Sequence, residues 1–401
     1  MLFLPFRRMY MKNIASKKVM NIGQTIFSVM TNMANEYNAI NLSQGFPDFP
    51  GPEFLKKAAC KAIMENKNQY VPSIGIPELR NAISQKYQHF YNLNYDPNSE
   101  ITVFSGATEA LFSSLSGILD PEDEVILFEP CYDAYSPVCH FNYAKLRYVR
   151  LEYPDFKIDK KNLESSFSEK TKCIIINTPN NPTGRVFSKD ELKLIGELCL
   201  EYDSIILTDE VYEHITFEKQ HFPIACFEKY KNRVITISST AKTFSLTGWK
   251  IGFALTSPEI ATAIRNIHQF VTFCTPGPFQ YAMVEAMKLA PNDPYFINLK
   301  KDYLKRRDFL DSKLREVGFR TIKTEGTYYI VADISPFGFN DDMEFCEFLT
   351  KQIGVAAIPM SAFYYTKNKV SNLVRFCFSK KLENLELAAQ RLEKLKDYIK
   401  K

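Results

Sequence analysis

The sequence lacks the features that mark several common classes of protein. Its 401 residues include only five histidines, none in a His-Glu-x-x-His arrangement, and we therefore expect no metal site. No uninterrupted apolar segment is long enough to cross a bilayer, so we expect no membrane-spanning helix. The formal net charge of +4 is small and dispersed, which argues against a nucleic-acid partner.

The cysteines lack the pattern of a disulfide framework. They number nine, an odd count, and no Cys-x-x-Cys pair occurs. This usage favours reduced, mostly buried thiols and predicts a cytoplasmic protein. At the N-terminus, Met1–Arg8 places its charges after a very short apolar run, the reverse of a signal peptide. We interpret it as a flexible arm, or as a start assigned too early, with Met9 or Met11 as the true start.

The length and the apolar pattern predict an α/β protein of two domains. Apolar residues make up 45% of the chain and charged residues 24%, as in ordinary globular proteins. Short β-branched runs alternate with helical segments, which predicts a mainly parallel sheet covered by helices. The predicted strands are 101–104, 124–128, 172–177, 204–208, 234–238 and 252–255. Among the predicted helices, residues 52–66 carry an apolar stripe of Phe54, Ala58, Ala62 and Ile63.

The pattern of predicted helices and strands changes after Pro291. A long helix ends near Gly318, and strands at 327–332 and 373–378 and a last amphipathic helix follow. A chain of 401 residues exceeds the usual size of a single core. We expect an N-terminal arm and part of the small domain at 1–45, a large domain at 46–290 and a C-terminal small domain of α+β type at 291–401.

The segment 238–250 is the strongest candidate for chemistry. Lys242 follows the apolar run Val234–Ile237, and a lysine at the end of a buried strand needs a partner or a function. The plain alternative is a basic loop rich in Ser and Thr. Ser239 and Lys242 also fit the Ser-x-x-Lys pair of penicillin-binding proteins, but the Ser-Asp-Asn and Lys-Thr-Gly partners of that pair do not occur.

Three further motifs stand where strands are expected to end. Asn181 follows the predicted strand 172–177, and Asp209 and Tyr212 follow the strand 204–208. Ligands gather at the carboxyl ends of strands in open α/β sheets, so these side chains should meet Lys242. The segment 105–108 joins a strand to a helix through small residues, and its bare backbone N–H groups predict a phosphate seat.

Together these motifs resemble those of class I and II pyridoxal-phosphate aminotransferases, over nearly the whole chain. The segments 41–49, 177–184 and 374–378 are most similar to the branch of kynurenine aminotransferase, glutamine transaminase K and bacterial methionine aminotransferase. The resemblance implies the fold-type-I architecture, pyridoxal 5'-phosphate as cofactor and a homodimer with shared active sites. It also implies transfer of an amino group from an L-amino acid with a bulky neutral side chain (methionine, aromatic or glutamine-like) to a 2-oxo acid.

The resemblance also implies a role for each candidate residue. Lys242, Asp209 and Tyr212 would be catalytic: the lysine bonds to the cofactor, the aspartate faces its ring nitrogen, and Tyr212 and Asn181 face its phenolic oxygen. Tyr132 would stack on the ring. The phosphate would be held by Gly106, Ala107, Thr108, Ser239 and Lys250, and by Tyr70 of the neighbouring subunit.

For the substrate, the resemblance assigns the α-carboxylate to Arg375. This arginine stands among apolar neighbours with no obvious acid nearby, although a salt bridge to a distant acid is the alternative. The other substrate-binding candidates are the backbone of Gly45, Asn181, Phe27 and Phe273, with Tyr70 beside them.

The pocket departs from the vertebrate kynurenine aminotransferases. Phe27 and Cys274 stand where those enzymes carry Trp and His, which argues against kynurenine as the main substrate. An apolar pocket without a second cation should favour neutral side chains and reject aspartate. A cysteine-S-conjugate β-lyase of the same fold is the nearest alternative. A ligand-sensing degenerate aminotransferase domain is a remote one, since no expected catalytic residue is missing and no DNA-binding segment precedes the domain.

Overall fold

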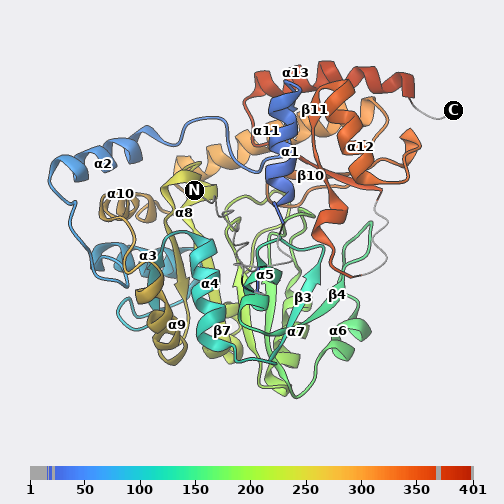
Figure 1. The fold of residues 1–401 in the computed structure, drawn as a ribbon. Coiled ribbons are helices and arrows are strands. Elements are labelled where there is room, and N and C mark those ends of the chain that lie inside the picture. Colours follow the sequence, from blue (N-terminus) through green and yellow to red (C-terminus); the bar gives the residue numbers. More distant parts are fainter. Residues whose placement is uncertain (1–15, 17, 20–22, 367–371, 399–401) are drawn as a thin grey trace, which may run out of the picture.

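The structure of the chain is a computed structural model that describes residues 16, 18–19, 23–366 and 372–398 (Figure 1). The expected N-terminal arm at Met1–Arg8 and the alternative starts at Met9 and Met11 lie outside the described residues. No helix within the described ranges is long and apolar enough to cross a membrane.

The larger sheet of the described chain has seven strands in the order β2-β8-β7-β6-β5-β3-β4. Its strands are β2 (Ile101–Phe104), β3 (Glu124–Glu129), β4 (Lys145–Arg150), β5 (Thr171–Asn177), β6 (Ile205–Asp209), β7 (Val234–Ser239) and β8 (Gly252–Leu255). The run from β4 to β7 is parallel, whereas β8 is antiparallel to both of its neighbours. The predicted α/β class is confirmed. The edge strand β4 was not predicted, because its alternating, partly exposed residues lack the apolar run of a central strand.

Both faces of this sheet are buried. Along β5, Cys173 and Ile175 belong to one apolar cluster, and Ile174 and Ile176 belong to the other. Alternate residues of a strand point to opposite faces, so a strand that is covered on both sides must be apolar at every position. This explains why the central strands could be recognised as continuous β-branched runs.

Helices surround the large sheet, and some of them connect its strands (Figure 1). They are α2 (Glu53–Met64), α3 (Pro77–Tyr91), α4 (Ala107–Ile118), α5 (Tyr135–Phe141), α6 (Lys160–Ser166), α7 (Lys189–Glu201), α8 (Thr240–Thr243), α9 (Pro258–Val271) and α10 (Gly277–Met287). Two starts follow the expected physics. Pro77 occupies the first turn of α3, and Ser188 and Glu191 form a capping box at α7.

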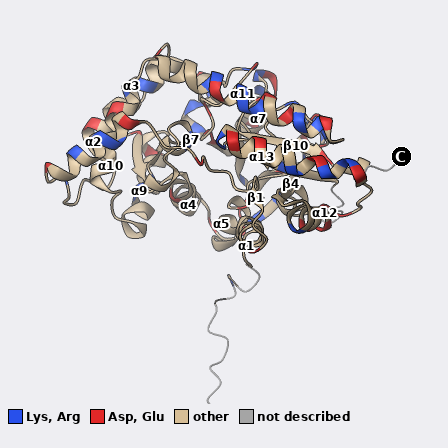
Figure 2. Ribbon diagram, turned by 90° about the horizontal axis from the view of Figure 1, so that it is seen from above, with Lys and Arg blue, Asp and Glu red and all other residues tan. Residues whose placement is uncertain are grey.

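The C-terminal part of the chain builds a second, four-stranded antiparallel sheet in the order β12-β13-β10-β9. Its strands are β9 (Arg320–Thr321), β10 (Tyr329–Asp333), β12 (Ile358–Pro359) and β13 (Leu373–Cys377). The helices around it are α11 (Pro294–Glu316), α12 (Asp342–Phe348) and α13 (Leu382–Leu392). In Figure 2 basic and acidic residues both occur along the ribbons of α11 and α13, as expected for helices with one face in solvent.

The N-terminal segment lies with these C-terminal elements. Helix α1 (Ile26–Glu36) stands beside them in Figure 1, and β1 (Ile40–Asn41) pairs in parallel with β11 (Val355–Ala356). The segment that follows β1 then passes toward the larger sheet and reaches the wall of the cavity described below at Gly45.

The predicted apolar stripe of α2 is divided between a buried face and an exposed face. In α2 the buried residues are Leu55, Ala59 and Ala62, whereas Phe54 and Ile63 are 40% and 44% exposed. The helix therefore carries apolar residues on an inner face and on an outer face. The outer face stays open to solvent in a single chain.

Candidate active site

A cavity of about 330 Å³ lies at the carboxyl edge of the parallel strands. Strands β5, β6 and β7 end there, at Asn177, Asp209 and Ser239, and α4 begins there. The structure places twelve of the predicted residues on its wall: Phe27, Gly45, Gly106, Ala107, Thr108, Tyr132, Asn181, Asp209, Tyr212, Ser239, Lys242 and Lys250.

Lys242 projects into this cavity from α8, the four-residue helix that follows β7. Its side chain is exposed only in part, because it borders a cavity enclosed by protein. Burial lowers the pKa of Lys242 to about 8, although the charge of Asp209 acts in the opposite direction. The ammonium lies 5.7 Å from the ring centre of Tyr212 and 5.9 Å from that of Tyr328, and no described residue forms a hydrogen bond with it. A primary amine in this setting is unprotonated in a useful fraction of molecules near neutral pH.

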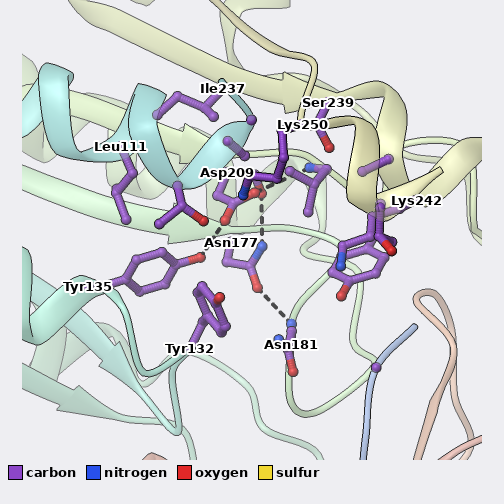
Figure 3. A pocket seen from close by; sticks show the side chains of 18 of the residues that line it. Leu111, Tyr132, Tyr135, Asn177, Asn181, Asp209, Ile237, Ser239, Lys242 and Lys250 are labelled. Carbon is purple, nitrogen blue, oxygen red and sulfur yellow. Dashed lines mark hydrogen bonds between the residues drawn. The ribbon is translucent and has the colours of Figure 1, made fainter. Parts of the chain in front are cut away.

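Asp209 ends β6 as a buried carboxylate (Figure 3). The Tyr135 hydroxyl donates to its Oδ2 at 2.7 Å, and the Val211 N–H donates to Oδ1 at 3.2 Å. Burial raises the pKa of Asp209, while these two donors and the charge of Lys242 oppose that rise. Among the described residues Asp209 forms no ion pair, so the site has room for one cationic partner at this carboxylate.

Asn181 is fixed by the loop that follows β5. Its N–H donates to Asn177 Oδ1 at 2.6 Å, and Asn177 Nδ2 donates to the backbone oxygen of Asp209 at 2.9 Å (Figure 3). One asparagine thus joins the ends of two neighbouring strands. The side-chain oxygen of Asn181 accepts from Arg375 Nη1 at 2.5 Å.

The turn between β2 and α4 forms a seat for an anion. Gly106 is the N-cap of α4 with a φ of 87°, a conformation that favours glycine. A Cβ at Gly106 would lie 3.2 Å from Lys250 Nζ, and a Cβ at Gly252 would lie 2.6 Å from the Ala107 nitrogen. Close packing against the backbone therefore requires glycine at 252, and the positive φ favours glycine at 106. The two glycines leave the first backbone N–H groups of α4 beside one lysine and the Ser239 side chain, which suits a phosphate.

Arg375 lies one layer behind the cavity wall and is fully buried. Besides its bond to Asn181, its Nη2 donates to Ser43 O at 3.2 Å, and its Nε has no partner. The guanidinium packs on the ring of Tyr329 at 3.9 Å and also touches Phe363 and Phe27. No described carboxylate forms an ion pair with it.

Besides Arg375 behind the wall, Tyr70 and Phe273 are the predicted residues that the structure does not bring to the cavity of their own chain. Tyr70 is 84% exposed and Phe273 is 51% exposed. Their rings meet edge to face with centroids 5.4 Å apart. Within one chain they line no part of the cavity.

Three residues of the site were not predicted. Tyr135 binds Asp209, Tyr329 meets Arg375 and the hydroxyl of Tyr212, and Asn177 holds Asn181. Asn177 carried a signal, since it is the first polar residue after an apolar strand. Nothing in the local sequence marks the two tyrosines among the 22 of the chain.

The comparisons with known proteins agree with this geometry. The family model for aminotransferase class I and II matches residues 37–392. Methionine aminotransferase of Escherichia coli K12 is 37% identical over 383 residues, covering 95% of this chain and 98% of that protein. Kynurenine–oxoglutarate transaminase 3 of the mouse is 36% identical over 411 residues, covering 96% and 90%. The structure of N-succinyldiaminopimelate aminotransferase from Mycobacterium tuberculosis superposes with a TM-score of 0.92 at 39% identity, covering 95% and 100%.

Proposed function

This chain belongs to the class I and II aminotransferases, which use pyridoxal 5'-phosphate, and from that premise we propose which residues hold the cofactor and which amino acids it serves. We propose that Lys242 bonds to the cofactor and that the amino donor is an L-amino acid with a bulky neutral side chain. One observation carries the site assignment. A lysine amine of lowered pKa shares a cavity with a buried carboxylate and a helix N-terminus.

The described residues fit the cofactor at both of its ends. The anion seat at Gly106–Thr108, with Ser239 and Lys250, suits the phosphate. Asp209 suits the ring nitrogen, because a buried carboxylate without an ion-pair partner favours a proton on a neighbouring base. Tyr132, on the cavity wall, suits the ring face.

The bound cofactor supplies an electron sink for the carbanion that forms when an amino acid loses its α-proton. The chain itself must then move that proton. The amine of Lys242, with a pKa of about 8, can accept a proton and return it near neutral pH. Asn181 and Tyr212 line the same cavity and offer an N–H group and a hydroxyl to the phenolic oxygen of the cofactor.

Arg375 is the proposed partner of the substrate α-carboxylate. A buried guanidinium with an unpaired Nε and no ion pair is costly unless an anion meets it. Because Asn181 and Tyr329 stand between Arg375 and the cavity, we expect their side chains to shift when a carboxylate binds. The Gly45 backbone borders the same end of the cavity.

The cavity wall supports the choice of a neutral side chain. Its described cations are Lys242 and Lys250, both assigned to the cofactor, and Phe27, Leu111 and Tyr329 supply apolar surface. Among the described residues no arginine borders the cavity to pair with a side-chain carboxylate. Methionine and aromatic amino acids therefore fit best, and aspartate fits worst.

A panel of amino donors tests the proposed substrates. Each L-amino acid would be added to the purified holoenzyme with a 2-oxo acid, and formation of the new amino acid would be followed. We expect kcat/KM to be highest for methionine and aromatic donors and lowest for aspartate. A preference for aspartate would contradict the assignment of the cavity.

The same samples test the lyase alternative. A cysteine S-conjugate is a substrate for either reaction, because both begin with loss of the α-proton. Release of pyruvate and ammonia without a 2-oxo acid measures elimination, and amino-group transfer measures transamination. The comparisons do not favour the lyase or the sensor, and we expect transfer to dominate.

We also propose a homodimer with shared active sites. Several large apolar side chains are exposed on neighbouring elements of one chain, including Met64 of α2, Tyr70, and Phe270 at 86% exposure in α9. A monomer would leave this surface in water, whereas a second copy would cover it. We expect Tyr70 to reach the phosphate of the partner's cofactor.

Complementation between two inactive variants tests the shared site. A Lys242→Ala subunit and a Tyr70→Ala subunit would be mixed and allowed to exchange. If Tyr70 acts on the partner's site, a heterodimer has one site with both residues and one with neither, so activity returns. Verified heterodimers without activity would show that Tyr70 serves its own chain or only packs in the interface.

A cytoplasmic location is the remaining proposal. All nine cysteines are free, and most are buried among apolar side chains. Unpaired thiols of this kind are typical of a reducing compartment. Fractionation of the source cells with an antibody to the protein would test it, and recovery with an oxidising compartment would contradict it.

A further inference from the structure

A buried acid–base pair lies directly behind the proposed phosphate seat. Glu109 in α4 and His268 in α9 approach to 2.6 Å between Oε1 and Nδ1, and the His268 side chain is fully buried. The His268 ring also stacks edge to face on Phe104, at the end of β2. None of the chemistry proposed above uses either residue.

Glu109 shapes the seat itself. It is the third residue of α4, and its Oε2 accepts from the Ser105 N–H at 2.6 Å. Ser105 directly precedes Gly106, so this bond fixes the turn whose N–H groups point into the cavity. This bond resembles the backward bond of a capping box, but it reaches the residue that precedes the N-cap Gly106.

This arrangement creates an electrostatic conflict. A carboxylate in the first turn of α4 stands close to the site proposed for a phosphate dianion. Two like charges in a partly dehydrated setting repel each other strongly, and that repulsion would weaken cofactor binding. A positive charge next to Glu109 would therefore be needed to offset the negative charge of its carboxylate.

His268 can supply that charge. Its Nδ1 faces the Glu109 carboxylate, and its Nε2 lies 2.7 Å from the Ser73 backbone oxygen, so both ring nitrogens face acceptors. A neutral imidazole has a single N–H and can donate to only one of them. One extra proton shared with Glu109 satisfies both contacts, and the pair is then neutral overall wherever that proton resides.

We propose that His268 is a positioning residue of the phosphate site, which cancels the charge of Glu109 so that Glu109 can fix the anion seat without repelling the anion. The inference rests on the proposed function, because it needs a phosphate at Gly106–Thr108. The bond to Ser73 also ties the seat to the segment 68–75, which carries Tyr70 toward the proposed partner chain.

The test compares two ligands that differ only in the phosphate. Apoprotein of the wild type and of His268→Gln would be titrated with pyridoxal 5'-phosphate and with pyridoxal, and both dissociation constants measured. Glutamine can still donate to Ser73 or to Glu109 but carries no charge. We expect pyridoxal phosphate to bind about tenfold or more weakly and pyridoxal to bind as before.

Two further variants separate charge from packing. In Glu109→Gln/His268→Gln neither charge is present, so most of the lost affinity should return. Thr272→Val removes a neutral donor to the same Glu109 oxygen, at 3.2 Å, and should leave both ligands unaffected. A purely structural role for His268 predicts instead that the double variant binds both ligands most weakly. It also predicts that the affinities for pyridoxal phosphate and for pyridoxal fall by the same factor.

Equal losses for the two ligands, or no recovery in the double variant, would overturn the inference. Should His268→Gln fail to fold, Glu109→Gln gives the same information. This variant keeps an acceptor for the Ser105 N–H and removes the negative charge. The ratio of the affinity for pyridoxal phosphate to that for pyridoxal should therefore equal or exceed the wild-type ratio. A lower ratio would refute the proposal. If the wild type bound no pyridoxal phosphate at Lys242, the proposed function would fail instead.

Discussion

The two ends of the cavity are built in different ways. The proposed phosphate end consists of backbone N–H groups from the single turn at Gly106–Thr108, flanked by Ser239 and Lys250. The proposed carboxylate end depends on one guanidinium, Arg375, whose partners Ser43 and Asn181 come from distant parts of the chain. The first end therefore depends on backbone conformation, and the second depends on a single charged side chain.

This difference predicts how each end responds to change. Removal of one side chain from the phosphate end leaves the helix N-terminus in place, so the cofactor should still bind with reduced affinity. Removal of Arg375 leaves, among the described cations of the cavity, only Lys242 and Lys250, which we assign to the cofactor. Lys242 and Asp209, on the same cavity wall, are the residues that we propose carry out the chemistry.

The largest expected effect comes from Lys242. Lys242→Ala removes the cofactor link and the proton carrier together, and kcat should fall by about 10³-fold or more. Steady-state assays with methionine and a 2-oxo acid measure this loss. Lys250→Gln is the matched control, since it removes a neighbouring lysine from the phosphate end. The Lys250→Gln variant should bind the cofactor more weakly yet keep most of kcat at saturating cofactor. An equal loss of kcat in both variants would contradict the different roles of the two lysines.

Arg375→Ala should be next in size. Each charge-assisted hydrogen bond contributes roughly 1.5–3 kcal/mol, so KM for the amino donor should rise by about 10- to 100-fold while cofactor affinity stays the same. Arg307→Ala is the control. Arg307 is also a buried arginine, but it pairs with Glu218 and lies outside the cavity wall, so its loss should lower stability without raising KM. Loss of cofactor from Arg375→Ala would instead place this residue at the cofactor end.

The pH dependence of cofactor capture tests the lowered pKa of Lys242. Only the unprotonated amine reacts, and burial lowers the pKa to about 8. Below that pH the capture rate of the apoprotein should rise about tenfold per pH unit, and above it the rate should level off. Stopped-flow absorbance measures the rate. Free Nα-acetyl-lysine, with its ordinary pKa, should keep gaining rate at higher pH, and a protein profile like that of the free amine would refute the assignment.

Tyr135→Phe should have the smallest effect. Its hydroxyl donates to Asp209 and favours the ionised carboxylate, so its removal raises the pKa of Asp209 further. The acid limb of kcat/KM should move to higher pH, and kcat should fall by about fivefold, the equivalent of about 1 kcal/mol. Tyr148→Phe, which removes a hydroxyl that bonds to Ser136 outside the cavity wall, should change neither. An unchanged acid limb in Tyr135→Phe would show that the hydroxyl does not act on Asp209.

The cofactor end could be predicted from the sequence because its determinants are local. Apolar strands stop at polar residues, and parallel strands bring those residues to one edge, as Asp209 and Lys242 illustrate. The surroundings of Arg375 could not be predicted in this way. Tyr329 reaches the guanidinium only because β10 pairs with β13 in a register that places Val331 opposite Arg375, and no local signal sets that register.

The ambiguity in α2 has a different cause. Apolar residues occur on both faces of this helix, and the pattern alone does not distinguish a face that meets the core from one that meets another chain. The stripe therefore predicted the helix but did not show which of its apolar residues meet the core. Tyr70 and Phe273 share this ambiguity, and their proposed roles await the exchange experiment.

The central claim is that Lys242 forms the bond to the cofactor. Borohydride reduction of the purified holoenzyme should make that bond permanent, and digestion followed by mass spectrometry should find the added mass on the peptide that carries Lys242. Lys250 lies on the same cavity wall and provides an internal comparison. Label on Lys242 alone is the result we predict, and label on Lys250 or on any other lysine would contradict the account.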